Sequence, residues 1–457
     1  MIMKKTLVIA FLALIPLMET TAQRVYTLEQ LKDSARHNNI ALHNARLSVE
    51  EASELRKEAH TKFFPSVSAS AMTFTANRGM AKMNVNPQEI IPSSLTPALS
   101  TTLPTEALVA LQDPISLSLL KNGTIAGITA MQPVFAGGQI INSNKLAKVG
   151  EDVARLQLSL SDNEVEKQTE RYFWQLVSLQ EKMKTVDAVD TLLADIHKDV
   201  DVAVRAGLAM RNDLLEVELR QNDIESQRVK LQNGIAVVRL LLAQYCGLDN
   251  DNFHAAHTET KDLVPEALQE QIHVLPEYQL LEKQVEAAQL QTKLAQGQNL
   301  PTLAIGAGYN YHNMLKTDRT FGMVFATLTV PISDWWGGTH AVRRRKIELQ
   351  QAQAQLADNQ ELLRIRTKKA WNDVMEAHQQ LQLARRSIGQ AKENLRLNRN
   401  HYQAGVKKMS DLLNAQLLYQ QSLDRSTDAY ADLQFKMLIY RQAAGIQIVN
   451  NMRMRKE

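Results

Sequence analysis

The chain has 457 residues, 44% of them hydrophobic and 22% charged, with a formal net charge of +3 at pH 7. This near balance argues against nucleic-acid binding, and the one dense basic run, residues 343–346, is more readily a solvated helix face than a phosphate-binding patch. The single cysteine, Cys246, excludes an internal disulfide and is expected to be a small, buried apolar residue.

Residues 1–22 have the features of a secretory signal peptide. Lys4 and Lys5 precede an apolar run over residues 7–18, and small residues follow where a signal peptidase would cut. The run is shorter than the ~20 apolar residues that a membrane-spanning helix needs, and no later stretch reaches that length. We therefore expect a mature chain that begins near Gln23 and does not cross a bilayer with helices.

A first repeat is predicted over residues 23–250. It opens with a capping box formed by Thr27 and Gln30, and the helix that follows is predicted to run to about Phe63. Residues 66–75 then alternate with a period of two, which predicts a strand with the ~9–11-residue length of a membrane-barrel strand.

The next part of the first repeat is predicted to be a loop between two strands. Residues 76–122 are rich in Pro, Ser and Thr and are expected to form a long exposed loop, before a second strand over residues 124–131. An elbow at residues 133–138 leads into a helix predicted to continue to Ala203, roughly 100 Å at ~1.5 Å per residue.

A polar-rich helix this long must bury an apolar stripe against neighbouring helices. The stripe is expected to consist of Leu156, Leu160, Val186, Val189, Leu193, Ile196 and Val200. A returning helix over residues 213–245 is only half as long. Two short helices end to end, this one and another over residues 276–299, would match one long helix.

A connecting segment over residues 251–275 separates the first repeat from a second one over residues 276–445. The second repeat has predicted strands at 302–311 and 321–330. As in the first repeat, the strand pair is followed by an elbow, a long helix, a hairpin tip and a returning helix. In the first of these strands, an apolar face lies opposite a small, polar one. Residues 446–457 form a C-terminal tail.

The strongest sign of duplication is a Gly-containing stretch that occurs twice at a constant offset of 198 residues. The matching positions are Gly207, Leu208 and Asp213 in the first copy and Gly405, Val406 and Asp411 in the second. Helical periodicity precedes each Gly, and N-capping side chains follow it. Residues 204–213 and 402–411 are therefore predicted to be the tips of two helical hairpins.

Four strands per chain cannot close into a barrel, and open strand edges in a membrane would leave backbone groups unsatisfied. The chain is therefore expected to oligomerise. Three copies would supply twelve strands, enough to enclose a water-filled lumen. The fold class is thus mainly α, with two repeats of long coiled-coil-like helices and two strands each.

A second elbow, at residues 331–338, matches the first at 133–138. With its paired elbows and paired tips, the chain resembles the outer membrane efflux protein family, the TolC-like exit ducts. The resemblance covers the whole mature chain. It implies a homotrimer with a 12-stranded barrel in the outer membrane lipid and a helical tunnel in the periplasm. It also implies a periplasmic adaptor and an inner-membrane transporter as partners, in a tripartite efflux system of RND or ABC type or in type I secretion.

The resemblance further implies that the tips constrict the tunnel entrance. Asp411 matches an aspartate of a carboxylate ring, whereas Asn414 stands where relatives often carry a second acid. Lys407 and Tyr402 match residues that tie hairpins together, with Asp213 as the acidic partner. The alternatives are that both aspartates serve only as helix N-caps and that Lys407 is simply exposed.

Two further sets of residues are candidates for interfaces. Apolar residues follow the glycines at the tips, and they could either dock an adaptor or merely close the turn; these positions are Gly207, Leu208, Gly405 and Val406. Trp335 and Trp336 lie at the second elbow, where they could form an interfacial aromatic belt or pack in an ordinary way.

Two other classes of function were weighed. No phosphate-binding loop, nucleophile with a base or metal-ligand spacing among the 11 histidines indicates an enzyme, so no cofactor or metal is expected, and His254 and His257 are expected to face solvent. A soluble periplasmic coiled-coil adaptor would also have a signal peptide and long hairpins, but the four strands argue against it.

Overall fold

The computed structural model describes residues 24–79, 81–86, 115–119, 121–257, 266–267, 271–314, 317–332 and 334–446. The predicted signal peptide, nearly all of the C-terminal tail and much of the loop at 76–122 lie outside these residues. The chain forms two compact units: unit 1 is Met1–Glu51, Asp152–Lys283 and Ala354–Glu457, and unit 2 is Ala52–Glu151 and Gln284–Gln353. Both units draw on both predicted repeats.

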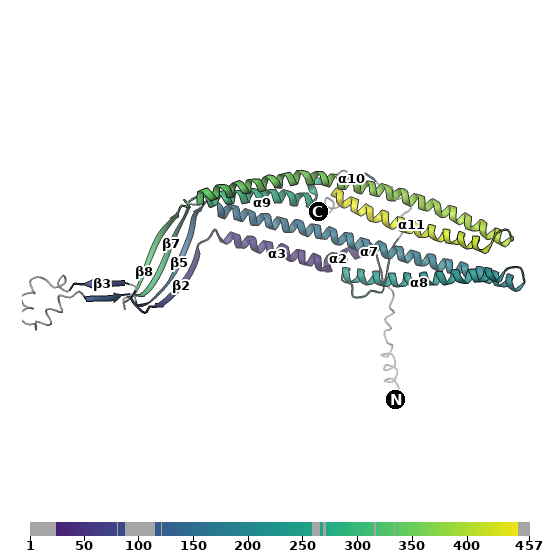
Figure 1. Cartoon of the computed structure of the whole chain (residues 1–457), viewed down its shortest axis with the longest axis horizontal. Helices are drawn as coiled ribbons and strands as arrows, with labels where there is room; N and C mark the ends of the chain where they lie inside the picture. Colours follow the sequence, from purple (N-terminus) through teal and green to yellow (C-terminus); the bar gives the residue numbers. More distant parts are fainter. Residues whose placement is uncertain are drawn as a thin grey trace, which may run out of the picture. The chain divides into compact units, whose positions relative to one another are not determined.

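Unit 2 contains a four-stranded antiparallel sheet with the order β2-β5-β7-β8 (Figure 1). Its strands are β2 (Ser66–Thr75), β5 (Asn122–Ala136), β7 (Thr302–Met314) and β8 (Thr317–Thr329). The two predicted hairpins thus lie side by side, with β5 paired to β7. Within the residues that the structure describes, the outer strands β2 and β8 are each paired along one side only, so the sheet has two open edges.

Several of the predicted strand and loop boundaries need correction. β5 continues through the predicted elbow to Ala136, because a register shift between Pro133 and Phe135 lets the strand pass a proline that cannot donate a hydrogen bond. β8 begins at Thr317 rather than 321. The loop at 76–122 is not wholly irregular, since β3 (Ala81–Val85) and β4 (Ile115–Leu119) pair within it.

The register of the sheet gathers apolar side chains on one face. Ala69 pairs with Ile128, Ile128 with Tyr309, and neighbouring pairs on the same face follow the same pattern. On the edge strand β8, Val324 on this face is 85% exposed. A broad apolar face of this kind is unsuited to water but suited to lipid.

The helices are α2 (Leu28–Asn38), α3 (Ile40–Thr61), α7 (Gln139–Arg205), α8 (Arg211–Cys246), α9 (Pro276–Gln298), α10 (Asp334–Gln403) and α11 (Met409–Ala444).

The Thr27–Gln30 capping box is confirmed. The single helix expected to reach Phe63 is instead divided at Asn39, whose backbone is extended. The Asn39 side chain accepts from the Ala41 amide at 2.9 Å and donates to the Tyr245 carbonyl at 3.0 Å. Within the described residues, no helix has the length and apolarity to span a membrane.

The short helices α8 and α9 both contact α7, in line with the expectation that together they match one long helix: Arg228 of α8 pairs with Asp190, and Lys283 of α9 pairs with Asp152. α9 also contacts α10, where the Thr292 hydroxyl donates to the Arg345 carbonyl. α3 also lies along α7, where Asn144 donates to the Ala59 carbonyl. α7 is therefore flanked by α3, which precedes the strands β2 and β5 in the sequence, and by α8, which follows them.

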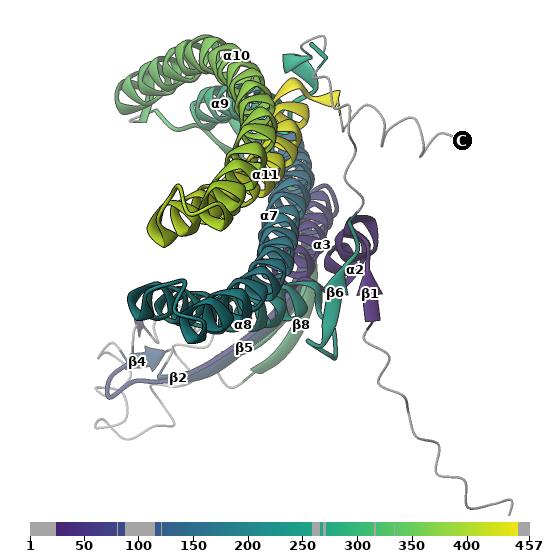
Figure 2. The same cartoon turned by 90° about the vertical axis from the view of Figure 1, so that its right-hand side faces the viewer.

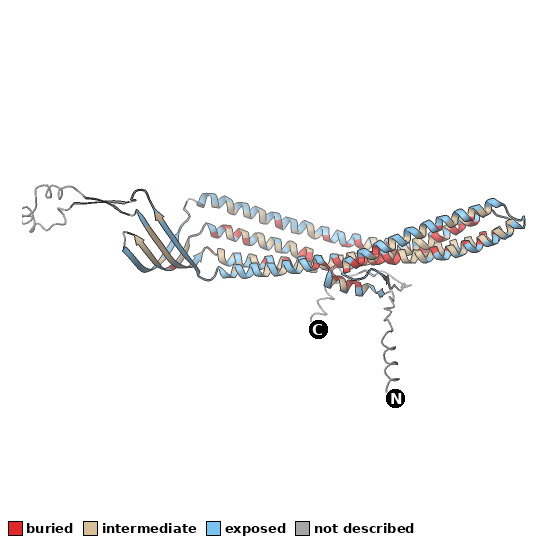
Figure 3. Ribbon diagram, turned by 90° about the horizontal axis from the view of Figure 1, so that it is seen from below, coloured by how far each residue is buried: buried red, intermediate tan, exposed pale blue. Residues whose placement is uncertain are grey.

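The apolar cores lie mainly in unit 1, where Figure 3 shows buried residues along the helices. Five of the seven residues of the predicted stripe on α7 are buried; they are Val186, Val189, Leu193, Ile196 and Val200. Cys246 is fully buried, and burial raises its thiol pKa to about 12, so it behaves as the small apolar residue expected from the sequence. A parallel pair of short strands, β1 (Arg24–Tyr26) and β6 (Phe253–Ala255), packs Phe253 beside this core.

A buried ion cluster joins α2 to α7. The Lys32 ammonium lies 2.8 Å from Glu170 and 3.1 Å from Glu166, and all three side chains are less than a tenth exposed. Arg36 and Trp174 donate additional hydrogen bonds to the two carboxylates. Burial would lower the pKa of Lys32, but the two carboxylates outweigh burial and raise it. The stabilisation is therefore present at neutral pH and is lost only as pH rises above the ordinary lysine range.

We predict that Lys32→Met destabilises unit 1, because it leaves two buried carboxylates without their ammonium partner. Breaking a buried ion pair in this way costs about 3 kcal/mol or more. Thermal unfolding in detergent, followed by circular dichroism, would measure the loss.

The control is Lys57→Met, which removes an exposed ion pair with Glu54. Exposed pairs contribute little, so its unfolding midpoint should match that of the wild type. Equal midpoints for both variants would show that the Lys32 cluster does not stabilise the fold.

Candidate functional site

The two predicted hairpin tips have the same backbone geometry, and both lie at one end of unit 1 (Figures 1 and 2). Gly207 and Gly405 each have φ +71°. The Leu208 amide donates to the Ala203 carbonyl and the Val406 amide to the His401 carbonyl, each at 2.8 Å. Each glycine amide also donates to the carbonyl three residues earlier, at 3.0 Å for Gly207 and 2.9 Å for Gly405. Together these bonds form the Schellman pattern, which ends a helix in a left-handed residue.

The aspartates after the turns lie inside the returning helices rather than at their N-caps. Met210 and Lys408 occupy the N-cap positions, and Asp213 and Asp411 are three residues on. Each carboxylate accepts from the backbone amide of its N-cap residue at 3.4 Å. The sequence analysis gave helix N-capping as the alternative role of both aspartates; each does bond the N-cap amide, but from a position three residues after the N-cap. Negative charge in a first turn also complements the helix dipole.

The residues expected at the gate do not all meet. Asp411 and Asn414 are both exposed and lie one turn apart on α11. Tyr402 is partly buried near Asp213 and Glu216, and burial together with these carboxylates raises its pKa. The Lys407 ammonium does not reach Asp213; it donates to the Asn398 side chain within its own hairpin at 2.9 Å. Lys407 and Tyr402 were expected to contact Asp213 of the other hairpin; within one chain, Tyr402 lies near Asp213 but Lys407 does not.

The apolar residues at the tips do not close the turns. Leu208 is 84% and Val406 71% exposed, so neither is packed against its own hairpin. Met210 adjoins Leu208 and is also exposed. Each tip therefore presents apolar surface to whatever lies beyond it.

Below the tips, a polar layer that the sequence analysis missed joins α8 to α11. The Arg220 Nε donates to Gln416 at 3.0 Å and its Nη2 to Gln420 at 2.8 Å, and Gln420 donates in turn to Gln227 at 2.7 Å. Gln416 is fully buried, and the Arg220 side chain is 11% exposed. The available signal was a pair of glutamines four residues apart on an otherwise apolar helix face.

The second elbow carries the two tryptophans. The Trp335 indole donates to the Asn299 carbonyl at 3.0 Å, whereas Trp336 is 86% exposed. Trp335 thus makes an ordinary structural contact, and Trp336 is the better candidate for a membrane interface. At the first elbow, Gly137 and Gly297 approach so closely that a Cβ on Gly137 would lie 2.2 Å from the Gly297 carbonyl oxygen.

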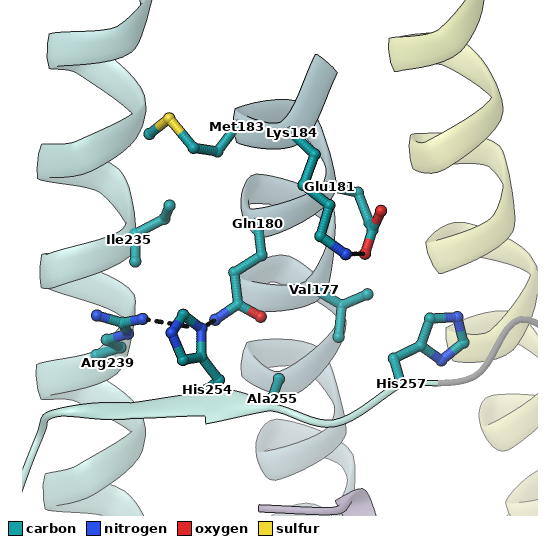
Figure 4. A pocket seen from close by; sticks show the side chains of 10 residues that line it. All are labelled: Val177, Gln180, Glu181, Met183, Lys184, Ile235, Arg239, His254, Ala255 and His257. Carbon is teal, nitrogen blue, oxygen red and sulfur yellow. Dashed lines mark hydrogen bonds and ion pairs between the residues drawn. The ribbon is translucent and has the colours of Figure 1, made fainter. Parts of the chain in front are cut away.

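A cavity of about 350 Å³ lies between α7, α8 and β6 (Figure 4). Gln180 and Arg239 both donate to Nδ1 of His254, which fixes this nitrogen as an acceptor because a guanidinium only donates. Burial, with Arg239 and Lys184 nearby, lowers the pKa of His254. Lys184 is paired with Glu181, so much of the charge in the cavity is compensated internally.

The two histidines of this region differ in exposure. His254 is exposed as predicted, but His257 is not: its ring lies 5.0 Å from the rings of both Trp174 and Tyr430. Within the described part of the chain, no group of three His, Cys, Asp or Glu residues is arranged to hold a metal ion.

Comparison with known proteins connects this fold with outer membrane channels. The family model described as outer membrane efflux protein matches residues 268–442. None of the curated protein sequences matches the chain.

Several solved structures share the fold over nearly the whole chain. The Campylobacter jejuni CmeC outer membrane channel is 14% identical, with a TM-score of 0.73 over 92% of this chain and 85% of that one. VceC, an outer membrane protein of Vibrio cholerae, is 14% identical with a TM-score of 0.70, over 92% and 96%. The open state of the Neisseria gonorrhoeae MtrE outer membrane channel is 14% identical with a TM-score of 0.69, over 92% and 88%.

The sheet, the duplicated hairpins and these similarities define an outer membrane channel fold. The outer membrane efflux protein model matches most of the second repeat but less than half of the chain. The resemblance predicted from the sequence is confirmed.

We predict that Gly207→Ala or Gly405→Ala loosens the corresponding tip. A Cβ would meet nothing within 4 Å at either position, so the penalty is that of the left-handed backbone alone, about 1–2 kcal/mol. Hydrogen–deuterium exchange at the turn amides should become faster in each variant.

Gly389→Ala is the matched control, because this glycine also has open space around it but lies inside α10. There, alanine is favoured over glycine and exchange should be unchanged or slower. Unchanged exchange in the tip variants would contradict the predicted backbone requirement.

Proposed function

We propose that three copies of the chain assemble into one channel. Each copy would contribute its four strands to a 12-stranded barrel in the outer membrane and its long helices to a periplasmic tunnel. The supporting observation is the four-stranded sheet with two open edges and a broad apolar face. In lipid, each unpaired backbone group on an open edge would cost several kcal/mol, and pairing β2 of one copy with β8 of the next would remove these edges.

The hairpin tips are proposed to form the tunnel entrance and to dock a periplasmic adaptor that couples the channel to an inner-membrane transporter. The exposed Leu208 and Val406 support this role, since the three copies would present six apolar tips. The transporter could be of RND or ABC type, or the system could be type I secretion. The chain is proposed to guide its cargo without chemical change and without a cofactor.

The competing proposal is a soluble periplasmic adaptor with long helical hairpins. It leaves the apolar face of the sheet without a partner, because exposed faces of this size are unfavourable in water. The family match and the shared fold favour the channel.

We predict that the mature protein fractionates with the outer membrane. After detergent extraction it should run as a trimer that dissociates on boiling, because barrel closure requires strands from all three copies. Light scattering of the extracted protein would give the mass. Recovery as a soluble monomer would contradict the channel and favour the adaptor.

The charge of the proposed entrance is carried by Asp411. In a trimer, the exposed Asp411 carboxylates would form a ring around the axis, while Asn414, one turn further on, adds no charge. Three carboxylates brought near each other attract divalent cations. The ring would hold fewer charges than one with acids at both positions.

We predict that Asp411→Asn reduces the block of single-channel conductance by divalent cations by several-fold while leaving the trimer intact. Asp213→Asn is the matched control, because Asp213 makes the same 3.4 Å contact with its N-cap amide but is partly buried. Equal cation block in Asp411→Asn and the wild type would assign Asp411 to capping alone.

A further inference from the structure

The polar layer below the tips buries a positive charge against neutral partners. The Arg220 guanidinium is held by the side-chain oxygens of Gln416 and Gln420, both on α11. The nearest carboxylate, Asp223, is 3.9 Å from Nη1 and its side chain is 70% exposed, so solvent weakens its effect. Burial lowers the pKa of Arg220 in spite of Asp223.

Arg228, two turns further along the same helix, shows the contrast. Its guanidinium is bonded to Asp190 at 2.8 Å and to Glu225 at 2.5 Å. These contacts join α8 to α7 within one hairpin and neutralise the charge. Arg220 instead joins the two hairpins of the chain to each other, and its charge is not neutralised across that contact.

A buried ion without a close counter-ion is destabilising, even when it is fully hydrogen-bonded to neutral groups. The amides recover part of the lost hydration, but the rest is regained only when water reaches the guanidinium. Contact between α8 and α11 at this level therefore holds Arg220 in an unfavourable environment, and separating the two helices relieves it. The apolar core around Val217, Met409 and Leu412 opposes this separation.

We propose that Arg220 is a positioning residue of the tunnel entrance, and that its incompletely neutralised charge biases the two hairpins toward separation. Gln416 and Gln420 limit this bias by satisfying the guanidinium while the helices are in contact. This inference rests on the proposed channel function, in which the hairpins must part to admit cargo. It adds a second determinant of opening, distinct from the exposed tip residues.

The proposal predicts that replacing the donor and replacing the acceptor of the Arg220–Gln416 hydrogen bond shift the contact between α8 and α11 in opposite directions. Arg220→Gln keeps a donor but removes the charge, so the contact between α8 and α11 should become more favourable. Gln416→Leu keeps the charge but removes an acceptor, so the contact should become less favourable by a factor of about ten. A residue that merely glues the hairpins together would give opening in both variants.

The test is single-channel recording of the purified trimer in planar lipid bilayers. Arg220→Gln should lower the open fraction and Gln416→Leu should raise it, each about tenfold. Arg228→Met should leave the open fraction unchanged, because the ion pairs of Arg228 lie within the α7–α8 hairpin. Changes of the same sign in the first two variants, or no change in either, would overturn the proposal while leaving the channel intact.

Hydrogen–deuterium exchange on the assembled protein provides a measurement that does not depend on conductance. Amides of α8 and α11 flanking the layer should exchange more slowly in Arg220→Gln and faster in Gln416→Leu. The reverse order would overturn the proposal even if a variant gave no current. A wild-type trimer that passes no current under any condition would instead contradict the channel function itself.

Discussion

The constraint on which the structure depends is that a sheet of four strands has two open edges. Within the described residues, β2 and β8 each leave one side without backbone partners, and the register gives the sheet one broad apolar face, while Phe321, Met323 and Phe325 of β8 lie on the other. A single copy is unfavourable in either solvent: in water its apolar face is exposed, and in lipid the backbone groups of its edge strands lack hydrogen-bond partners. Only a closed barrel built from several copies meets both demands. The sequence of unit 2 thus specifies an assembly rather than a stable single copy.

In unit 1, Lys32 and Arg220 show two different ways of holding a cationic side chain away from solvent. Lys32 is enclosed by carboxylates that raise its pKa, so its burial favours the folded state at neutral pH. Arg220 is enclosed by amides and keeps part of its desolvation cost. The first arrangement suits a junction that must stay formed, between α2 and α7. The second suits a contact between hairpins that must be able to part.

Local signals in the sequence predicted most elements of the fold. Periodicity identified the long helices and the strands, the Thr27–Gln30 pattern fixed a helix start, and the glycines located both tips. The break at Asn39 was missed because it depends on a hydrogen bond to the Tyr245 carbonyl, distant in the sequence. The continuation of β5 past Pro133 was missed because a proline usually ends a strand, whereas here a register shift accommodates it.

The choice of partners was harder to predict than the elements themselves. An apolar stripe shows which face of a helix is buried but not which neighbours cover it, so the contact of α9 with α10, in addition to its contact with α7, was not predicted. The same limit applies at the tips. Their turns and aspartate contacts follow from residues close in sequence, and these were predicted within a few positions. The Arg220 layer pairs residues almost 200 positions apart, and no local pattern indicates that pairing.

The structure also separates the shape of the tips from the forces that hold them together. Each turn is closed by its own backbone hydrogen bonds, and Lys407 is bonded inside its own hairpin, so the turns need no contribution from their neighbours. The contacts between hairpins lie deeper, in the apolar core that includes Met409 and Leu412 and in the adjoining polar layer. Changing an exposed charge at a tip would therefore alter what enters more than whether the hairpins part, whereas changing the buried layer would do the opposite.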